Sequence, residues 1–163
     1  MVTLTEHTDK VTTKQKINFR NLKESLVNAR LSYFNNPMNK PNLENYKKAL
    51  KTLDDAMVSP PASELERDGM IQRFKYCLEI SWNSAKKILE FQGYKVDTPR
   101  NIFRELARIG WINNPDDWIE FLESRNKTSH MYHEEIANEL FGIIPSFLKA
   151  SHDLLNVLED NLK

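Results

Sequence analysis

Apolar residues recur three and four positions apart through most of this 163-residue chain, and no run alternates with the two-residue period of a strand. Residues at that spacing share one face of a helix, so each such run predicts an amphipathic helix. The predicted helices cover about Ile17–Phe34, Leu43–Met57, Ser63–Gln92 and Thr98–Ile109, a fifth that opens at Pro115, and His133–Glu159. The pattern predicts an all-α protein.

Short polar or proline-containing breaks separate these helices. The runs "NNPMNKP" and "SPPASE" are loops by composition, since they are rich in asparagine, serine and proline. Thr98 and Asn114 are N-cap candidates, each followed by a proline that suits the first helical position. Gly93 ends the third helix, and Pro145 predicts a kink or a division in the last one.

The short connections predict an antiparallel up-and-down helical bundle with four principal helices, one shorter helix and an N-terminal extension. Residues 1–36 form the extension in this prediction, either as an extra helix or as a partly mobile segment. Residues 37–163 form the bundle domain.

Composition and charge narrow the classes of function. With 40% hydrophobic and 28% charged residues, the chain has the profile of a globular protein and not of a disordered one. Twenty-three basic and 23 acidic residues cancel, so phosphate binding must be local. We expect a cytoplasmic protein without membrane contact, because no apolar run reaches the length of a span and the N-terminus lacks the apolar region of a secretory signal. The single cysteine, Cys77, cannot form an internal disulfide and is expected to be buried.

Polar chemistry concentrates in the stretch "WIEFLESRNKTSHMYHEE", which follows the start of the fifth helix. Trp118 and Phe121 begin an apolar stripe that Arg125 continues, and the spacing then runs Arg125-x4-His130-x-Tyr132. A guanidinium without a partner is costly on a packed surface. A wet cleft shared by two subunits would remove this conflict.

The residue types of this stretch suit phosphodiester chemistry. The planar fork of Arg125 matches two phosphate oxygens, His130 titrates near neutrality, and Asn126 offers both a donor and an acceptor. Together they could assist attack by a neighbouring 2′-hydroxyl and stabilise charge on phosphorus without a metal. The alternative is that Arg125 caps the end of its helix and that His130 is an ordinary loop residue.

Other features allow weaker interpretations. Arg100, Arg104 and Arg108 form a ridge at four-residue spacing that could follow an RNA backbone, or could simply be a solvated helix face. A metal site is not expected, since His130, His133 and Glu134 have no fourth ligand, and no cofactor is expected either. The three tryptophans are assigned to the core, with base stacking as the alternative; they are Trp82, Trp111 and Trp118.

Three blocks together carry a family resemblance: "GMIQRFKYCLEISWNSAKKILEFQGY", "TPRNIFRELARIGWI" and "WIEFLESRNKTSHMYHEEIANEL". From about Asn42 to Asp160 the chain resembles the HEPN superfamily, and within it the nucleotidyltransferase substrate-binding, HepT-like branch. The resemblance implies an all-α homodimer encoded beside a minimal nucleotidyltransferase in a toxin–antitoxin-like pair of genes.

The resemblance also implies roles for the motif residues. Arg125 would hold the scissile phosphate of RNA, Asn126 would assist, and His130 would act as acid or base in a metal-independent endoribonuclease. Tyr132 would accept AMP from the nucleotidyltransferase, which silences the site. The alternative function is a non-enzymatic partner subunit that presents a surface or substrate to the nucleotidyltransferase.

Overall fold

The computed structural model describes residues 23–28, 40–127 and 134–163. The chain divides into two compact units, residues 1–40 and residues 41–163. In the first unit residues 23–28 are helical and exposed, which includes the apolar side chains of Leu26 and Val27. The rest of the predicted helix Ile17–Phe34 lies outside the described residues, and the predicted division after residue 36 stays a prediction.

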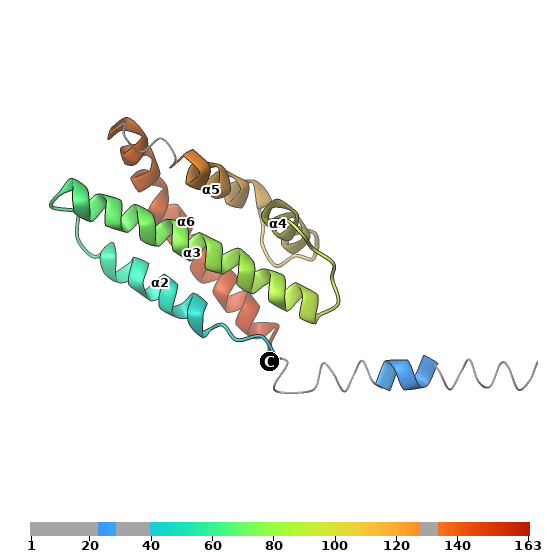
Figure 1. The fold of residues 1–163 in the computed structure, drawn as a ribbon. Coiled ribbons are helices and arrows are strands. Elements are labelled where there is room, and N and C mark those ends of the chain that lie inside the picture. Colours follow the sequence, from blue (N-terminus) through green and yellow to red (C-terminus); the bar gives the residue numbers. More distant parts are fainter. Residues whose placement is uncertain (1–22, 29–39, 128–133) are drawn as a thin grey trace, which may run out of the picture. The chain divides into compact units, whose positions relative to one another are not determined.

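The second unit is all-α in its described part, as the sequence predicts (Figure 1). Its helices are α2 (Glu44–Ala56), α3 (Glu64–Phe91), α4 (Pro99–Arg108), α5 (Pro115–Lys127) and α6 (Glu134–Asp160). In Figure 1, α3 and α6 run in one direction while α2 and α5 run in the other. These four are the principal helices of the predicted up-and-down bundle, and α4 is the shorter one.

Local side-chain contacts explain where the helices begin and end. Ser63 Oγ accepts from the Glu66 backbone N–H at 3.2 Å, and Thr98 Oγ1 accepts from the Asn101 N–H at 3.3 Å, so both act as N-caps. Pro99 occupies the first turn of α4. Gly93 follows α3 with a φ of 91°, a conformation that favours glycine.

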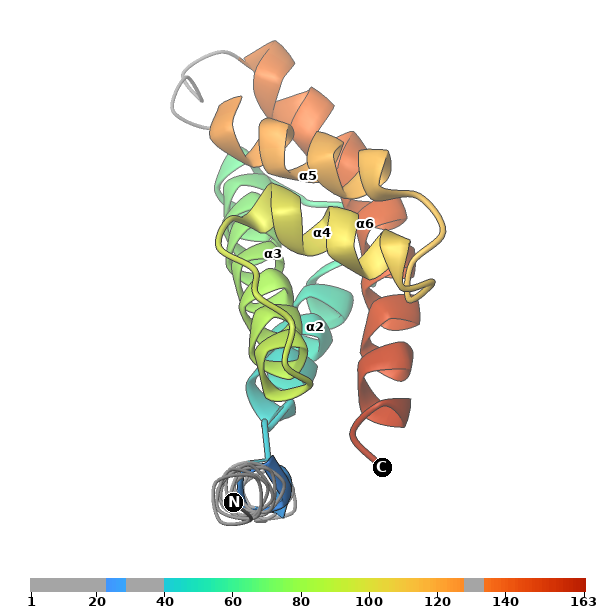
Figure 2. The same ribbon diagram turned by 90° about the vertical axis from the view of Figure 1, so that its right-hand side faces the viewer.

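The parallel pair α3 and α6 is tied at both ends. Near the start of both helices Arg67 Nη1 donates to Asn138 Oδ1 at 2.9 Å, and near their ends Gln92 Nε2 donates to the Asn161 carbonyl at 3.3 Å. Figure 2 shows α4 and α5 side by side against this pair. The face that α4 and α5 share with α3 carries the candidate site described below.

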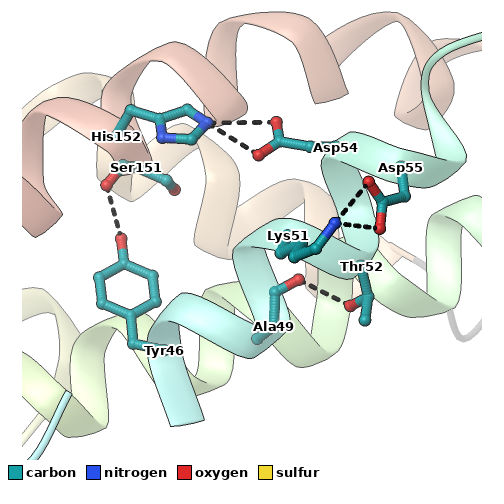
Figure 3. A network of polar contacts seen from close by, with 8 residues as sticks. All are labelled: Tyr46, Ala49, Lys51, Thr52, Asp54, Asp55, Ser151 and His152. Carbon is teal, nitrogen blue, oxygen red and sulfur yellow. Dashed lines mark hydrogen bonds and ion pairs between the residues drawn. The ribbon is translucent and has the colours of Figure 1, made fainter. Parts of the chain in front are cut away.

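Helix α2 is joined to α6 by polar contacts (Figure 3). Tyr46 Oη donates to the Ser151 carbonyl at 3.0 Å inside the core, and desolvation by burial raises the pKa of Tyr46. The hydroxyl therefore stays protonated and available as a donor. At the surface the His152 Nε2 lies 3.0 Å from the Asp54 carboxylate.

Aromatic rings from four helices form the centre of the core. Phe103 of α4 stacks on Trp118 of α5 at 4.4 Å between ring centroids. Phe147 of α6 meets Phe74 of α3 and Phe121 of α5 edge to face, at 4.9 Å and 5.4 Å. All five rings are buried, so this cluster fixes the positions of α4 and α5 relative to α3 and α6.

Pro145 lies inside α6, which is continuous from Glu134 to Asp160. The proline does not divide the helix, contrary to one of the two predicted outcomes. It has no N–H to offer the carbonyl of Phe141 one turn earlier. Among the described residues, no helix combines the length and the apolarity needed to cross a bilayer.

Candidate functional site

A pocket of about 280 Å³ opens where the last turns of α5 meet α3 and the first turn of α4. Its wall contains apolar side chains and two arginines. The lining residues are Leu78, Glu79, Trp82, Thr98, Pro99, Arg100, Leu122, Arg125 and Asn126. Two of the predicted motif residues, Arg125 and Asn126, are therefore at one site with Arg100 from the predicted ridge.

Arg125 reaches from α5 to a carboxylate on α3. Its Nη2 donates to Glu79 Oε2 at 3.1 Å, with the two side chains 42% and 51% exposed. The buried positions of α5 are instead Trp118, Phe121 and Ser124. The expectation that Arg125 continues the buried stripe is wrong, because the small serine takes the next inward position and leaves the arginine at the rim of the pocket.

Arg100 is held at the other side of the pocket. Its Nη2 donates to Glu123 Oε1 of α5 at 2.8 Å, with both side chains about half exposed. Glu123 itself does not line the pocket. Each of the two arginines at the pocket therefore has a carboxylate partner, and these four charges sum to zero.

The other two members of the predicted arginine ridge do not line the pocket. Arg104 is exposed on α4, and Arg108 donates through Nε and Nη2 to Glu105 at 2.8 Å and 2.6 Å. The hydrogen bond from Arg108 holds the pKa of Glu105 below its usual value. Arg108 also lies 6.0 Å from the ring centroid of Tyr94. All three arginines are exposed on α4, and of the three only Arg100 lines the pocket.

The remaining motif residues, His130 and Tyr132, lie outside the described residues, as does His133. Both sides of that stretch are tied down by described contacts. Lys127 Nζ donates to Glu139 Oε1 at 2.6 Å and so links the end of α5 to α6. Arg67, described above, links the first turns of α6 to α3.

The inner wall of the pocket is apolar. Leu78 is 1% exposed, while Leu122 and Trp82 are partly buried and pack against the main core. Trp82 therefore borders both the core and the pocket. The sequence assigned Trp82 to the core, and no local signal revealed that Trp82 and Glu79 would line a pocket with Arg125.

An aromatic and aliphatic wall beside two arginines and an amide suits a planar group that carries negative charge. Guanidinium groups can hold phosphate or carboxylate oxygens, and the indole offers a flat surface for a ring. Among residues 23–28, 40–127 and 134–163, no group of three or more His, Cys, Asp or Glu side chains has the arrangement of a metal site.

The sequence matches one family model over residues 41–160, that of "Nucleotidyltransferase substrate binding protein like". Among individual proteins, the chain is similar to "Probable ribonuclease HepT" of Haemophilus influenzae, with 33% identity over 95 residues. That match covers 55% of this chain and 65% of the relative, which is less than two thirds of the relative's length.

Two solved structures share the fold. One is the crystal structure of ttk003001694 from Thermus thermophilus, with a TM-score of 0.66 and 28% identity over 69% of this chain and 98% of that one. The other is HI0074 from Haemophilus influenzae, with a TM-score of 0.66 and 28% identity over 72% of this chain and 99% of that one. HI0074 is described as having the fold of a substrate binding domain of a nucleotidyltransferase.

Proposed function

Because the chain belongs to the nucleotidyltransferase substrate binding protein like family, we propose that it acts with a minimal nucleotidyltransferase as a HepT-like ribonuclease. In this proposal two copies of the chain form a homodimer, and the Arg125-x4-His130 motifs of both copies face one cleft. The cleft cleaves RNA without a metal ion. The observation that carries the proposal is Arg125 and Asn126 at the rim of one pocket, in a chain similar to a protein named as a probable ribonuclease.

The proposed reaction is transfer of the phosphodiester to the neighbouring 2′-hydroxyl. The 2′-oxygen forms a bond to phosphorus while a base removes its proton, and the bond from phosphorus to the 5′-oxygen breaks as that oxygen gains a proton. His130 is the residue that moves a proton, because imidazole can do so near neutral pH. Arg125 binds the non-bridging oxygens and stabilises the charge that grows on them.

The contact between Arg125 and Glu79 supports this role for the arginine. The carboxylate lines the pocket and accepts from one Nη of Arg125 at 3.1 Å. A guanidinium has five N–H donors in a planar fork, so an arginine can bind a carboxylate and a phosphate at the same time. Glu79 is thus suited to hold the guanidinium at the pocket. Asn126, on the same rim, offers a further hydrogen bond.

The nucleotidyltransferase partner regulates the site in this proposal. Transfer of AMP to the Tyr132 hydroxyl would place a bulky anion two residues from His130. The added phosphate would compete with RNA for Arg125, since both are anions of the same chemistry. Adenylylated protein is then expected to leave RNA uncut.

The test is incubation of purified protein with total cellular RNA in EDTA. We expect cleavage by the natural chain and none by Arg125→Ala or His130→Ala. Arg73→Ala is the matched control, because Arg73 is an exposed arginine of α3 whose Nη1 bonds to the carbonyl of Gly69 in its own helix. Equal cleavage by Arg125→Ala and the natural chain would mean a contaminating nuclease and would sink the proposal.

The second candidate is a non-enzymatic partner subunit of the nucleotidyltransferase. It is favoured by the formal net charge of zero and by the carboxylate partners of both pocket arginines, which give the chain no general attraction for RNA. This function predicts intact RNA with every variant and a stable complex with the nucleotidyltransferase. Size-exclusion chromatography of the two purified proteins together would detect that complex.

A further inference from the structure

We infer that the pocket beside Arg125 is a nucleotide-binding subsite in which Trp82 takes the base and Arg100 a phosphate. The inference rests on the proposed function, since it names the part of an RNA substrate that this site would bind next to the scissile phosphate. The ligand chemistry is an aromatic base joined to an anionic phosphate. Such a group can come from an unpaired position of RNA or from a mononucleotide.

The apolar side of the pocket is built for a flat ring. Trp82 packs against the main core on one side and lines the pocket on another, so its indole is supported in place. Leu78 and Leu122 add an aliphatic surface beside it. Every nucleic-acid base has a flat face that can stack on an aromatic side chain, so this wall would accept any unpaired base. The volume of about 280 Å³ is just below the range of about 300–1,000 Å³ that is usual for small-molecule pockets.

The charged side of the pocket is built for an anion. Arg100 and Arg125 come from two different helices and both line the same cavity. A purely apolar ligand would gain nothing from these two guanidinium groups, whereas a nucleotide uses both sides of the pocket. Two cationic side chains also match two phosphates, one on each side of a nucleoside within RNA.

The two carboxylates at the site have different geometry. Glu79 lines the pocket, so its contact keeps Arg125 there. Glu123 does not line the pocket, and it accepts from the Nη2 of Arg100 at 2.8 Å. A phosphate that takes this Nη2 of Arg100 competes with Glu123. Removing the charge of Glu123 is therefore expected to strengthen nucleotide binding.

The decisive measurement is binding of a fluorescent 2′-O-methyl hexanucleotide, which has no 2′-hydroxyl and so cannot be cleaved, followed by anisotropy. We expect Trp82→Leu to weaken binding roughly 5- to 150-fold, the range of a lost base–aromatic stack. Trp111→Leu is the matched control, because Trp111 is also half-buried against the main core but does not line the pocket. It should change binding less than twofold, as a remote substitution would.

Three further arms make the result specific. The first arm uses a series of hexanucleotides that each lack the base at a different position. One of these abasic positions should weaken binding to the natural chain. The same abasic position should cause no further loss in Trp82→Leu, which has already lost the stack. Glu123→Gln should tighten binding about 1.5- to 5-fold without changing the affinity for adenosine, which lacks a phosphate. AMP in place of the hexanucleotide separates a mononucleotide site from an RNA site, and dependence on Trp82 with either probe supports the inference.

Trp82→Phe covers the case in which the leucine variant does not fold, since it keeps a ring and should retain most of the affinity. Equal binding by Trp82→Leu and Trp111→Leu, or binding of neither probe by the natural chain, overturns the inference. These outcomes are distinct from those of the ribonuclease proposal. Trp82-dependent binding without RNA cleavage in EDTA leaves the subsite standing and removes the nuclease, while cleavage with no Trp82 dependence does the reverse.

Discussion

Glu79→Gln separates two roles of the contact with Arg125, a structural one and a functional one. The substitution keeps the size of the side chain and one oxygen that can accept a hydrogen bond, and it removes the charge. Two unit charges 3.1 Å apart attract by about 1.3 kcal/mol at the dielectric constant of water. Because both side chains are about half exposed, partial desolvation and lost side-chain entropy reduce the net value to about 0.2–1 kcal/mol.

A loss of that size is small in stability. For a domain of this length it lowers the Tm by no more than about 4 °C. Positioning of a catalytic group has a larger effect, because a displacement of about 1 Å can reduce a rate on the order of 100-fold. We therefore expect Glu79→Gln to reduce RNA cleavage by about 10- to 100-fold while the Tm barely changes. A tenfold loss already corresponds to about 1.4 kcal/mol, more than the contact contributes to stability.

The assay is single-turnover cleavage of a labelled RNA in EDTA, with the Tm from circular dichroism. Saturating and limiting protein concentrations separate the rate of the bound complex from binding, and the loss is expected in the rate of the bound complex. A charge-exchanged double variant, Glu79→Arg with Arg125→Glu, should keep the Tm of the natural chain but should not cleave RNA. Glu159→Gln is the control, because it breaks a 2.6 Å ion pair with Lys47 between α2 and α6, far along the chain from the motif.

Unchanged or faster cleavage by Glu79→Gln would refute the positioning role. Faster cleavage would in addition identify Glu79 as a carboxylate that competes with phosphate for Arg125.

The remaining predictions concern the core that supports the site. Phe147→Ala should lower the free energy of unfolding by about 3–5 kcal/mol, because the buried ring joins α6 to α3 and α5, and urea denaturation measures it. Tyr46→Phe should lower it by about 0.5–1.5 kcal/mol through loss of the 3.0 Å bond to the Ser151 carbonyl; an unchanged value would show that the bond contributes nothing net. Burial raises the pKa of Cys77 to about 12 from 9.0, so the folded thiol keeps its proton in a pH range where the unfolded one loses it. The stabilisation that this raised pKa gives to the fold is complete below pH 9 and is lost as the pH rises toward 12. Cys77→Ala should therefore make the Tm fall less steeply above pH 9. Iodoacetamide should label Cys77 only after the chain unfolds.

The helices were predictable because their signals are local. Thr98 caps α4 through a contact with Asn101 three residues away, and Gly93 follows α3 because of its own backbone conformation. Periodic apolar spacing then identifies the buried face of a long helix such as α3. The burial of Cys77 followed from the same spacing and is confirmed.

Of the residues that line the pocket, the sequence could identify those that belong to the short motif, but not their partners from distant parts of the chain. Arg125 and Asn126 could be found from spacing, but Glu79 is 46 positions from Arg125, and a single sequence holds no record of that contact. The orientation of Arg125 was mispredicted for a related reason. Helical periodicity allows either Ser124 or Arg125 to follow Phe121 on the inward face, and the packing of α5 against its neighbours decides between them.

The carboxylate partners of both pocket arginines have a consequence for ionic strength. When a protein cation neutralises a nucleic-acid phosphate, condensed counterions are released and affinity falls steeply as salt is added. Here a phosphate that reaches Arg100 would liberate the Glu123 carboxylate, which attracts cations of its own from solution. The cations taken up by the carboxylate offset the counterions released from the phosphate. The plot of log affinity against log salt concentration should therefore be shallower than the number of phosphate contacts alone implies.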